Sequence, residues 1–205
     1  ADNPIASMRA EYLAQLETLT DETKRKIYLF GKWAIQKGRI YDWDVQPAPA
    51  RYDDIVYGLD FGYSVNPSAL IRIYRRGDEF WLEEVVYQAG LTNQALAAEM
   101  RAAGLGRHDA IYADSAEPKS IDEISELGFN VEPCDKGPDS VRSGIDFLKS
   151  KTIHIVQGST HIIREAGRYT WRVDRNGNTI PDPVKFDDHA MDAARYGIVT
   201  HCKRG

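Results

Sequence analysis

Three aspartates stand where they could act on a substrate together. Asp60 and Asp114 each close an apolar run typical of a β-strand, 55–61 and 110–113, and Asp192 lies in the final helical pattern. In an open sheet with helical crossovers, functional side chains gather at the carboxyl ends of strands. A single aspartate at a strand end more often caps a turn or a helix, so only the convergence of all three would indicate chemistry.

The final helical pattern offers two further candidates beside Asp192. Asp188 and Asp192 are four residues apart and share a helix face on the flank of the apolar stripe. Asp187 or Asp188 has a simple structural role as the N-cap, whereas Asp192 lies beyond the cap position. His189 could be a ligand, a residue that orients a ligand, or a surface residue. We keep Asp188 and His189 as candidates next to the three aspartates.

Three converging carboxylates would need cations in order to coexist. Two such charges about 4 Å apart repel each other by ~4 kcal/mol at an effective dielectric constant of 20, so they must protonate or bind metal. Ligation by oxygen alone selects Mg²⁺ or Mn²⁺ rather than Zn²⁺. Two ions ~4 Å apart can activate water and stabilise an in-line displacement at phosphorus. The sequence therefore predicts two-metal hydrolysis of a phosphodiester, with no other cofactor.

The elements that must position these residues follow from the periodicity of the sequence. Strands at 55–61, 69–74 and 80–87 form an antiparallel meander. Helices at 93–103, 119–127, 140–150 and 160–167 then alternate with strands at 110–113, 130–132 and 152–156, before a hairpin at 169–180 and a helix at 188–201. Alternation of strands and helices implies parallel additions to the sheet. We expect an α/β fold whose mixed central sheet is flanked by helices.

The chain divides at a proline-rich stretch. Pro47 and Pro49 break any helix, so residues 1–51 read as a helical segment followed by an extended connector, and residues 52–205 as the main domain. The first segment holds two amphipathic helices, at 7–19 and 21–35. Since the sequence opens without an initiator methionine, we expect this segment to be a trimmed junction to a further domain.

Composition limits the classes of partner. The 205 residues include 26 basic and 31 acidic ones, a net charge of -5, which excludes a protein whose whole surface binds nucleic acid. The segment from Lys136 to Arg175, however, contains eight basic and only four acidic residues. Cys134 and Cys202 are too few for a disulfide framework, and no apolar run approaches the ~18 residues of a membrane span. Candidate nucleic-acid contacts are Lys119, Lys136, Arg142, Arg168, Arg172 and Arg175.

Four segments carry a family resemblance. They are Tyr57-Gly-Leu-Asp-Phe-Gly62, Ala113-Asp-Ser-Ala-Glu-Pro-Lys-Ser120, Lys136-Gly-Pro-Asp-Ser-Val-Arg142 and Asp188-His-Ala-Met-Asp-Ala-Ala-Arg-Tyr196. In this order they resemble the nuclease domain of tailed-phage large terminase subunits, a ribonuclease H-like fold. The resemblance extends from Tyr52 to about Val199.

The resemblance implies a function and a set of roles. Asp60, Asp114 and Asp192 match the metal-binding carboxylates, and Asp188 and His189 match residues beside the third. The hairpin matches an element that contacts DNA or regulates cleavage. Apart from the resemblance, its Tyr169 and Trp171 could lie flat beside a sugar or base. The implied activity is a metal-dependent endonuclease that cuts concatemeric viral DNA during genome packaging, with low sequence specificity, in the host cytoplasm. The implied partners are double-stranded DNA and, in the full-length protein, an ATPase domain, the portal protein and the small terminase subunit.

One departure from the family and two alternatives remain. The phosphate-binding string Gly-x-x-x-x-Gly-Lys-[Ser/Thr] occurs nowhere in the sequence, so we expect this chain to cut DNA without translocating it. A Holliday-junction resolvase or transposase-like nuclease would use the same fold and carboxylates. In a non-catalytic DNA-binding assembly module, the three aspartates would be structural and would not bind Mn²⁺ tightly.

Overall fold

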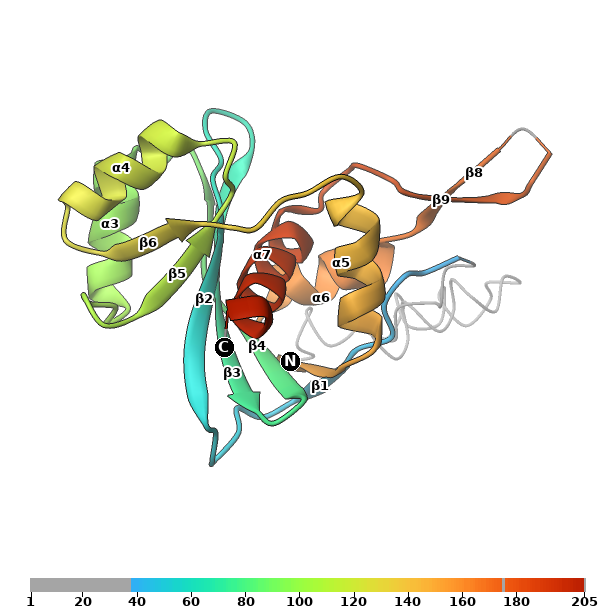
Figure 1. Ribbon diagram of the computed structural model, residues 1–205, viewed down its shortest axis with the longest axis horizontal. Helices are drawn as coiled ribbons and strands as arrows, with labels where there is room; N and C mark the ends of the chain where they lie inside the picture. The colour runs from blue at the N-terminus through green and yellow to red at the C-terminus, as the bar shows by residue number, and fades with distance from the viewer. Residues whose placement is uncertain (1–37, 175, 205) are drawn as a thin grey trace, which may run out of the picture. The chain divides into compact units, whose positions relative to one another are not determined.

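A seven-stranded mixed sheet forms the centre of the domain in the computed structural model, which describes residues 38–174 and 176–204. The strand order is β1-β7-β4-β3-β2-β5-β6 (Figure 1). The strands of this sheet are β1 (Asp44–Gln46), β2 (Asp54–Asp60), β3 (Pro67–Arg76), β4 (Glu79–Ala89), β5 (Ala110–Ala113), β6 (Asn130–Pro133) and β7 (Thr152–Val156). The other elements are α3 (Asn93–Ala102), α4 (Pro118–Glu126), α5 (Ser140–Lys149), α6 (Thr160–Arg168), the hairpin strands β8 (Trp171–Val173) and β9 (Thr179–Pro183), and α7 (His189–Arg204).

The pairing of the strands confirms the predicted architecture. Strands β2, β3 and β4 form the antiparallel meander. Strands β5 and β6 add in parallel beside β2, while β7 and β1 add in parallel beside β4 at the other edge. In the pairing of β2 with β5, Leu59 lies opposite Ala113. The next residues, Asp60 and Asp114, therefore end neighbouring strands at the same edge of the sheet.

Helices cover both faces of the sheet and create two apolar cores. Helices α3 and α4 lie on one face, and α5, α6 and α7 on the other (Figure 1). Successive side chains of a strand point to opposite faces, so Leu59 packs in the core under α3 and α4, whereas Val56 packs in the core under α7. By the same alternation, Asp60 lies on the α7 face of the sheet.

Helix α7 approaches the sheet closely because two glycines face each other. A Cβ atom added to Gly58 of β2 would lie 1.8 Å from the carbonyl oxygen of Ala193 in α7. A Cβ atom added to Gly197 of α7 would lie 3.2 Å from the Cα atom of Gly58. Small residues let two backbones meet, and this contact sets the distance from α7 to the carboxyl end of β2.

The N-terminal part of the chain differs in detail from the predicted connector. Strand β1 lies within the predicted N-terminal segment 1–51, just before the two prolines, and pairs with β7, with Asp44 opposite His154. The compact unit that the structure describes begins at Gly38, so part of the predicted connector belongs to the sheet. The helices predicted at 7–19 and 21–35 lie outside the described residues. None of the described helices is long and apolar enough to cross a membrane.

We expect the substitution Gly58→Ala to destabilise the domain by at least about 2 kcal/mol, because the new methyl group would overlap the backbone of α7. The matched control is Gly106→Ala, since a Cβ atom at Gly106 would meet no atom within 4 Å. Urea denaturation of both variants measures the free energy of unfolding. Equal stabilities of the two variants would show that the close approach of α7 to β2 is not required.

Candidate metal and nucleic-acid site

A pocket of about 350 Å³ lies where the ends of β2 and β5 meet the start of α7. Its lining includes the three predicted aspartates, both residues that sequence reasoning placed beside them, and cationic and hydroxyl-bearing side chains. These residues are Asp60, Asp114, Asp188, His189, Asp192, Lys136, Lys185, Arg195 and Tyr196. The structure thus brings the predicted carboxylates to one place, as their convergence required.

Asp60 is the most enclosed of the three aspartates. Its side chain is 13% exposed, and His189 Nδ1 lies 2.9 Å from its Oδ2 atom. Burial raises the pKa of Asp60 to about 6, and the nearby charges of Asp192 and Asp114 act in the same direction. The hydrogen bond to Asp60 raises the pKa of His189 in turn. His189 therefore orients Asp60 in the structure, one of the roles left open for it.

Asp114 is held by three donors. Its Oδ1 atom forms an ion pair with Lys136 and accepts a hydrogen bond from the backbone N–H of Ala116 at 2.7 Å. Its Oδ2 atom lies 3.1 Å from the hydroxyl oxygen of Tyr196. Burial acts to raise the pKa of Asp114, but the hydrogen bonds from Lys136 and Ala116 outweigh it and lower the pKa. Asp114 is thus a carboxylate in this state, neutralised by the protein's own lysine.

Asp192 has an internal cation as well. Arg195 Nη2 donates to its Oδ1 atom at 2.6 Å, and the hydroxyl oxygen of Tyr196 lies 3.4 Å from its Oδ2 atom. Tyr196 therefore stands between Asp114 and Asp192 and can donate its single proton to one of them at a time. Sequence reasoning passed over Tyr196 and Arg195, although their spacings of four and three residues from Asp192 place all three on one helix face.

Asp188 occupies the cap position of α7 by its backbone. Its carbonyl oxygen accepts a hydrogen bond from the N–H of Asp192 at 2.9 Å. Its side chain lines the pocket, where burial raises its pKa and the charge of Asp192 adds to the effect. The preceding residue, Asp187, adopts a left-handed backbone with a φ of 56°. Asp188 therefore combines the cap position with a place among the carboxylates.

The donor set of the pocket fits divalent cations. Several carboxylates share a small polar space, and their mutual repulsion contributes to the raised pKa of Asp60. In residues 38–174 and 176–204, however, no three His, Cys, Asp or Glu side chains are arranged to hold one ion. Instead, Lys136 pairs with the carboxylate of Asp114, and Arg195 pairs with that of Asp192. The donor types fit metal, whereas the side-chain positions are those of a site neutralised by the protein itself.

The predicted nucleic-acid contacts are scattered. Of these residues, Lys136 lines the pocket. Lys119 and Arg142 are exposed, in the first turns of α4 and α5 respectively. Arg168 pairs with Asp187 at 3.7 Å. The structure does not describe Arg175, and the DNA-contacting role of all these residues stays a prediction.

The hairpin β8–β9 extends away from the sheet (Figure 1). Arg172 on β8 is exposed and pairs with Asp182 on β9 at 2.6 Å. Tyr169, which sequence reasoning offered as a ring that could lie beside a sugar or base, is instead 3% exposed and stacks on Tyr41. Trp171 packs against the core at the base of the hairpin. The aromatic part of the predicted DNA contact is therefore wrong for Tyr169, because its ring belongs to the core.

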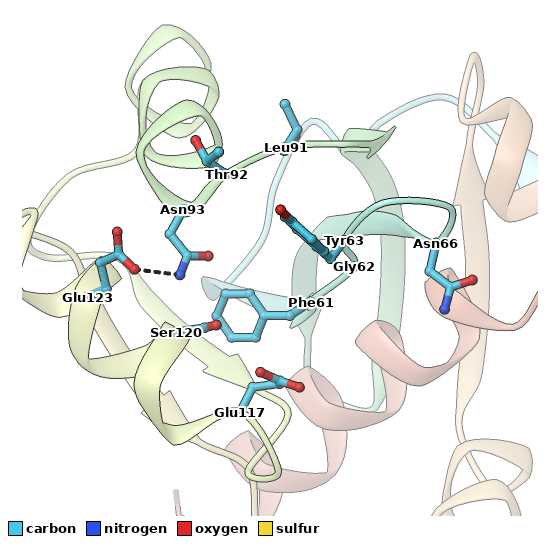
Figure 2. Close-up of a pocket in the computed structure, with 10 residues that line it drawn as sticks. All are labelled: Phe61, Gly62, Tyr63, Asn66, Leu91, Thr92, Asn93, Glu117, Ser120 and Glu123. Carbon is cyan, nitrogen blue, oxygen red and sulfur yellow. Dashed lines mark hydrogen bonds between the residues drawn. The ribbon is translucent and has the colours of Figure 1, made fainter.

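A second hollow, of about 610 Å³, lies beside α3 and α4. Figure 2 shows the ring of Phe61 within it, with Asn93 bonded to Glu123 on one side and Glu117 on the other. Phe61 directly follows Asp60, and its ring packs with the core under α3 and α4. None of the predicted site residues lines this hollow. The clustered aspartates are therefore confined to the pocket on the α7 face.

Sequence reasoning missed a buried carboxylate that supports the start of α7. Glu165 in α6 is fully buried and accepts hydrogen bonds from the backbone N–H groups of Ala190 at 2.7 Å and Met191 at 3.2 Å. The hydroxyl group of Tyr87 donates to it at 2.5 Å. The first N–H groups of a helix lack partners within the helix, so a carboxylate placed there both satisfies them and fixes the helix start. Burial raises the pKa of Glu165 to about 7.

Comparisons with known proteins agree on one family. Residues 60–199 match the family described as "Terminase RNAseH like domain". The large terminase subunit of Bacillus phage SPP1 is 34% identical over 184 residues, which are 86% of this chain and 42% of that protein. The PBSX phage terminase large subunit of Bacillus subtilis (strain 168) is 30% identical over 144 residues, 69% of this chain and 33% of that protein. The chain spans less than half of the length of both relatives.

A solved structure of a terminase nuclease domain is also similar to this chain. The nuclease domain of the SPP1 large terminase, g2p, with bound Mn superposes on this chain with a TM-score of 0.69 at 30% identity. The match covers 80% of this chain and 98% of that domain. The ribonuclease H-like fold and the resemblance noted from the sequence are thereby confirmed.

We expect Glu165 to make the stability of the domain depend on pH. At low pH its carboxyl group is protonated in both the folded and the unfolded chain. Between about 4.5 and 7 the unfolded chain releases this proton while the folded chain retains it, so stability falls as pH rises. A shift of this size corresponds to a loss on the order of 3 kcal/mol, complete above the folded pKa. The variant Glu165→Gln should lack this part of the pH dependence.

The measurement is urea denaturation from pH 4 to pH 8 in metal-free buffer. The control is Glu99→Gln, which removes an exposed carboxyl group from α3 and should leave the wild-type pH dependence in place. Parallel stability curves for Glu165→Gln and wild type would contradict the assignment of a raised pKa to Glu165.

Proposed function

This chain belongs to the terminase RNase H-like family, and we propose that it is a divalent-metal-dependent endonuclease that cuts double-stranded DNA. The observation that carries the proposal is the meeting of Asp60, Asp114 and Asp192, from three separate elements, in one pocket of a terminase nuclease fold. The bound Mn of the SPP1 nuclease domain supports divalent metal use by this chain. We further propose that two Mg²⁺ or Mn²⁺ ions bind here, held by Asp60, Asp114 and Asp192, with the Asp188 carboxylate beside them.

The residues of the pocket have distinct roles in this proposal. Asp60, Asp114 and Asp192 would hold the ions, and His189 keeps the Asp60 carboxylate oriented by its hydrogen bond. Bound divalent ions would supply Lewis acidity, which makes water a stronger nucleophile and stabilises the charge that develops at phosphorus. Tyr196 positions the carboxylates of Asp114 and Asp192 relative to each other. Glu165 fixes the start of the helix that carries His189 and Asp192.

The biological setting of the cut is a wider proposal. As part of a large terminase subunit, the chain would cut concatemeric viral DNA during genome packaging in the host cytoplasm, with low sequence specificity. The remaining length of the relatives leaves room for the ATPase domain that we propose accompanies it. The portal protein and the small terminase subunit would be its partners. No phosphate-binding loop string occurs in this sequence, so we expect it to cut DNA without hydrolysing ATP.

The family match favours this function over the alternatives considered from the sequence. A junction resolvase or a transposase-like nuclease would use the same fold and carboxylates, but the matched family is that of terminases. A non-catalytic assembly module gives no reason for Asp60, Asp114 and Asp192 to line one pocket, where burial and the nearby charges of Asp192 and Asp114 raise the pKa of Asp60.

We expect Asp60→Asn, Asp114→Asn and Asp192→Asn each to abolish DNA cutting in Mg²⁺ or Mn²⁺ while the domain stays folded, because each change removes a metal-binding charge. Cleavage of a linear duplex at saturating Mn²⁺, with circular dichroism to verify folding, measures this. Ca²⁺ should bind without supporting much turnover.

Variants of the neighbouring residues provide the contrast. His189→Ala and Asp188→Ala should lose only part of the activity, since the first residue orients Asp60 and the second lies at the helix cap. Near wild-type cutting by any of the three Asn variants would remove that aspartate from the assignment. Complete loss in Asp188→Ala would place Asp188 among the metal ligands.

We expect the hairpin to bind the DNA backbone. Changing Arg172 and Arg175 together to Ala should reduce the dependence of DNA affinity on log salt by up to about two units, because each phosphate contact releases counterions. Filter binding of a duplex in an Asp60→Asn background measures this without cleavage. Asp182→Asn is the opposite control, since it frees Arg172 from its ion pair and should strengthen binding. An unchanged salt slope would move the DNA path away from the hairpin.

A further inference from the structure

Lys136 occupies a place that a metal ion would need. Its ammonium group forms an ion pair with Oδ1 of Asp114, which also accepts from the N–H of Ala116, while Oδ2 of Asp114 faces the Tyr196 hydroxyl. Three donors thus surround this carboxylate. An ammonium group and a divalent ion on one carboxylate oxygen repel each other, so the two compete for Oδ1 of Asp114.

We propose that a divalent metal ion displaces Lys136 from Asp114, and that the released ammonium group then binds a DNA backbone phosphate. The inference rests on the proposed function and adds a coupling to it. In the metal-free state Lys136 neutralises Asp114 and competes with metal. In the metal-bound state it contributes a phosphate contact beside the ions.

The two internal cations of the pocket differ in their freedom to move. Lys136 is 32% exposed and lies in the loop between β6 and α5, and its stem is long and flexible. Arg195, by contrast, is 5% exposed, and its stem packs so tightly on α5 that a Cβ atom added to Gly144 would lie 2.6 Å from its Cδ atom. Arg195 is therefore fixed, and Lys136 is the cation that an incoming ion can displace.

The surroundings of Lys136 suit a phosphate. The pocket that it lines also contains Lys185 and Ser140, from the segment before α7 and the start of α5. A phosphate brought to the carboxylates for cutting has neighbouring phosphates on the same strand, and these are the anions nearest to a displaced ammonium group. Because linkage is reciprocal, metal binding should then strengthen DNA binding and DNA should strengthen metal binding.

The first test measures metal alone. Binding of Mn²⁺ to the full chain without DNA is measured by isothermal titration calorimetry for wild type, Lys136→Gln and Lys136→Arg. Removal of the competing cation should tighten Mn²⁺ binding by roughly 3- to 10-fold in Lys136→Gln, and Lys136→Arg should stay near wild type. The control is Lys185→Gln. Lys185 lines the same pocket but forms no ion pair with the three aspartates, so its loss should change Mn²⁺ affinity by less than about 2-fold.

The second test measures DNA. The salt dependence of binding to a short duplex is compared in EDTA and in Ca²⁺ for wild type and Lys136→Gln. In EDTA, the slope of log DNA affinity against log salt concentration should be equal for the two proteins, because Lys136 is then held by Asp114. In Ca²⁺ the wild-type slope should be steeper than that of Lys136→Gln by about one unit, the contribution of one phosphate contact.

The outcomes separate this proposal from the function on which it rests. Equal or weaker Mn²⁺ binding by Lys136→Gln, or a slope difference that is the same in EDTA and Ca²⁺, would overturn the release of Lys136 and leave the nuclease assignment intact. Failure of wild type to bind Mn²⁺, or unchanged Mn²⁺ binding in Asp114→Asn, would overturn both.

Discussion

The close contact between α7 and β2 is the constraint on which the site depends. Gly58 and Gly197 let the helix lie directly on the strand, and the carboxylates at the end of each element are brought together as a result. Side chains at the two positions would push the helix outward and move Asp192 away from Asp60. Glu165 acts on the same contact from the other side, since its buried carboxyl group binds the first N–H groups of the helix. Backbone packing and helix capping therefore place charges that would otherwise repel each other.

Those charges are balanced by the protein in different ways. Asp60 lies deepest, and its raised pKa makes protonation one route to neutrality. Asp114 is matched by a lysine on a loop, and Asp192 by an arginine packed between helices. The carboxylates can thus share one pocket without bound ions, because internal protons and cations reduce their repulsion. These two cations differ in exposure, since the side chain of Lys136 is 32% exposed and that of Arg195 is 5% exposed.

The two faces of the sheet differ in what they carry. Helices α3 and α4 cover a core that includes Leu59 and Ala113, the residues directly before Asp60 and Asp114. The other face carries α7 and the carboxylate pocket. Because side chains alternate along a strand, the end of β2 contributes to both faces of the sheet: Leu59 lies in the core under α3 and α4, and Asp60 lies in the carboxylate pocket. The rigidity of the sheet is thereby transmitted to the site by adjacent residues.

Local sequence patterns predicted most of the elements, the mixed sheet and the three aspartates. Periods of two and of 3.6 residues mark strands and helices locally, and strand-end aspartates follow from the same pattern. The sequence left open the role of Glu165 and the pairing of β1 with β7, because both depend on contacts between residues far apart in the chain. It also offered Tyr169 as a ring that could contact DNA, since an aromatic residue beside a turn gives the same local pattern whether it is exposed or buried. Only the tertiary structure decided which cation neutralises each carboxylate, because ion pairs such as Lys136 with Asp114 join loops and strands whose separation no local pattern encodes.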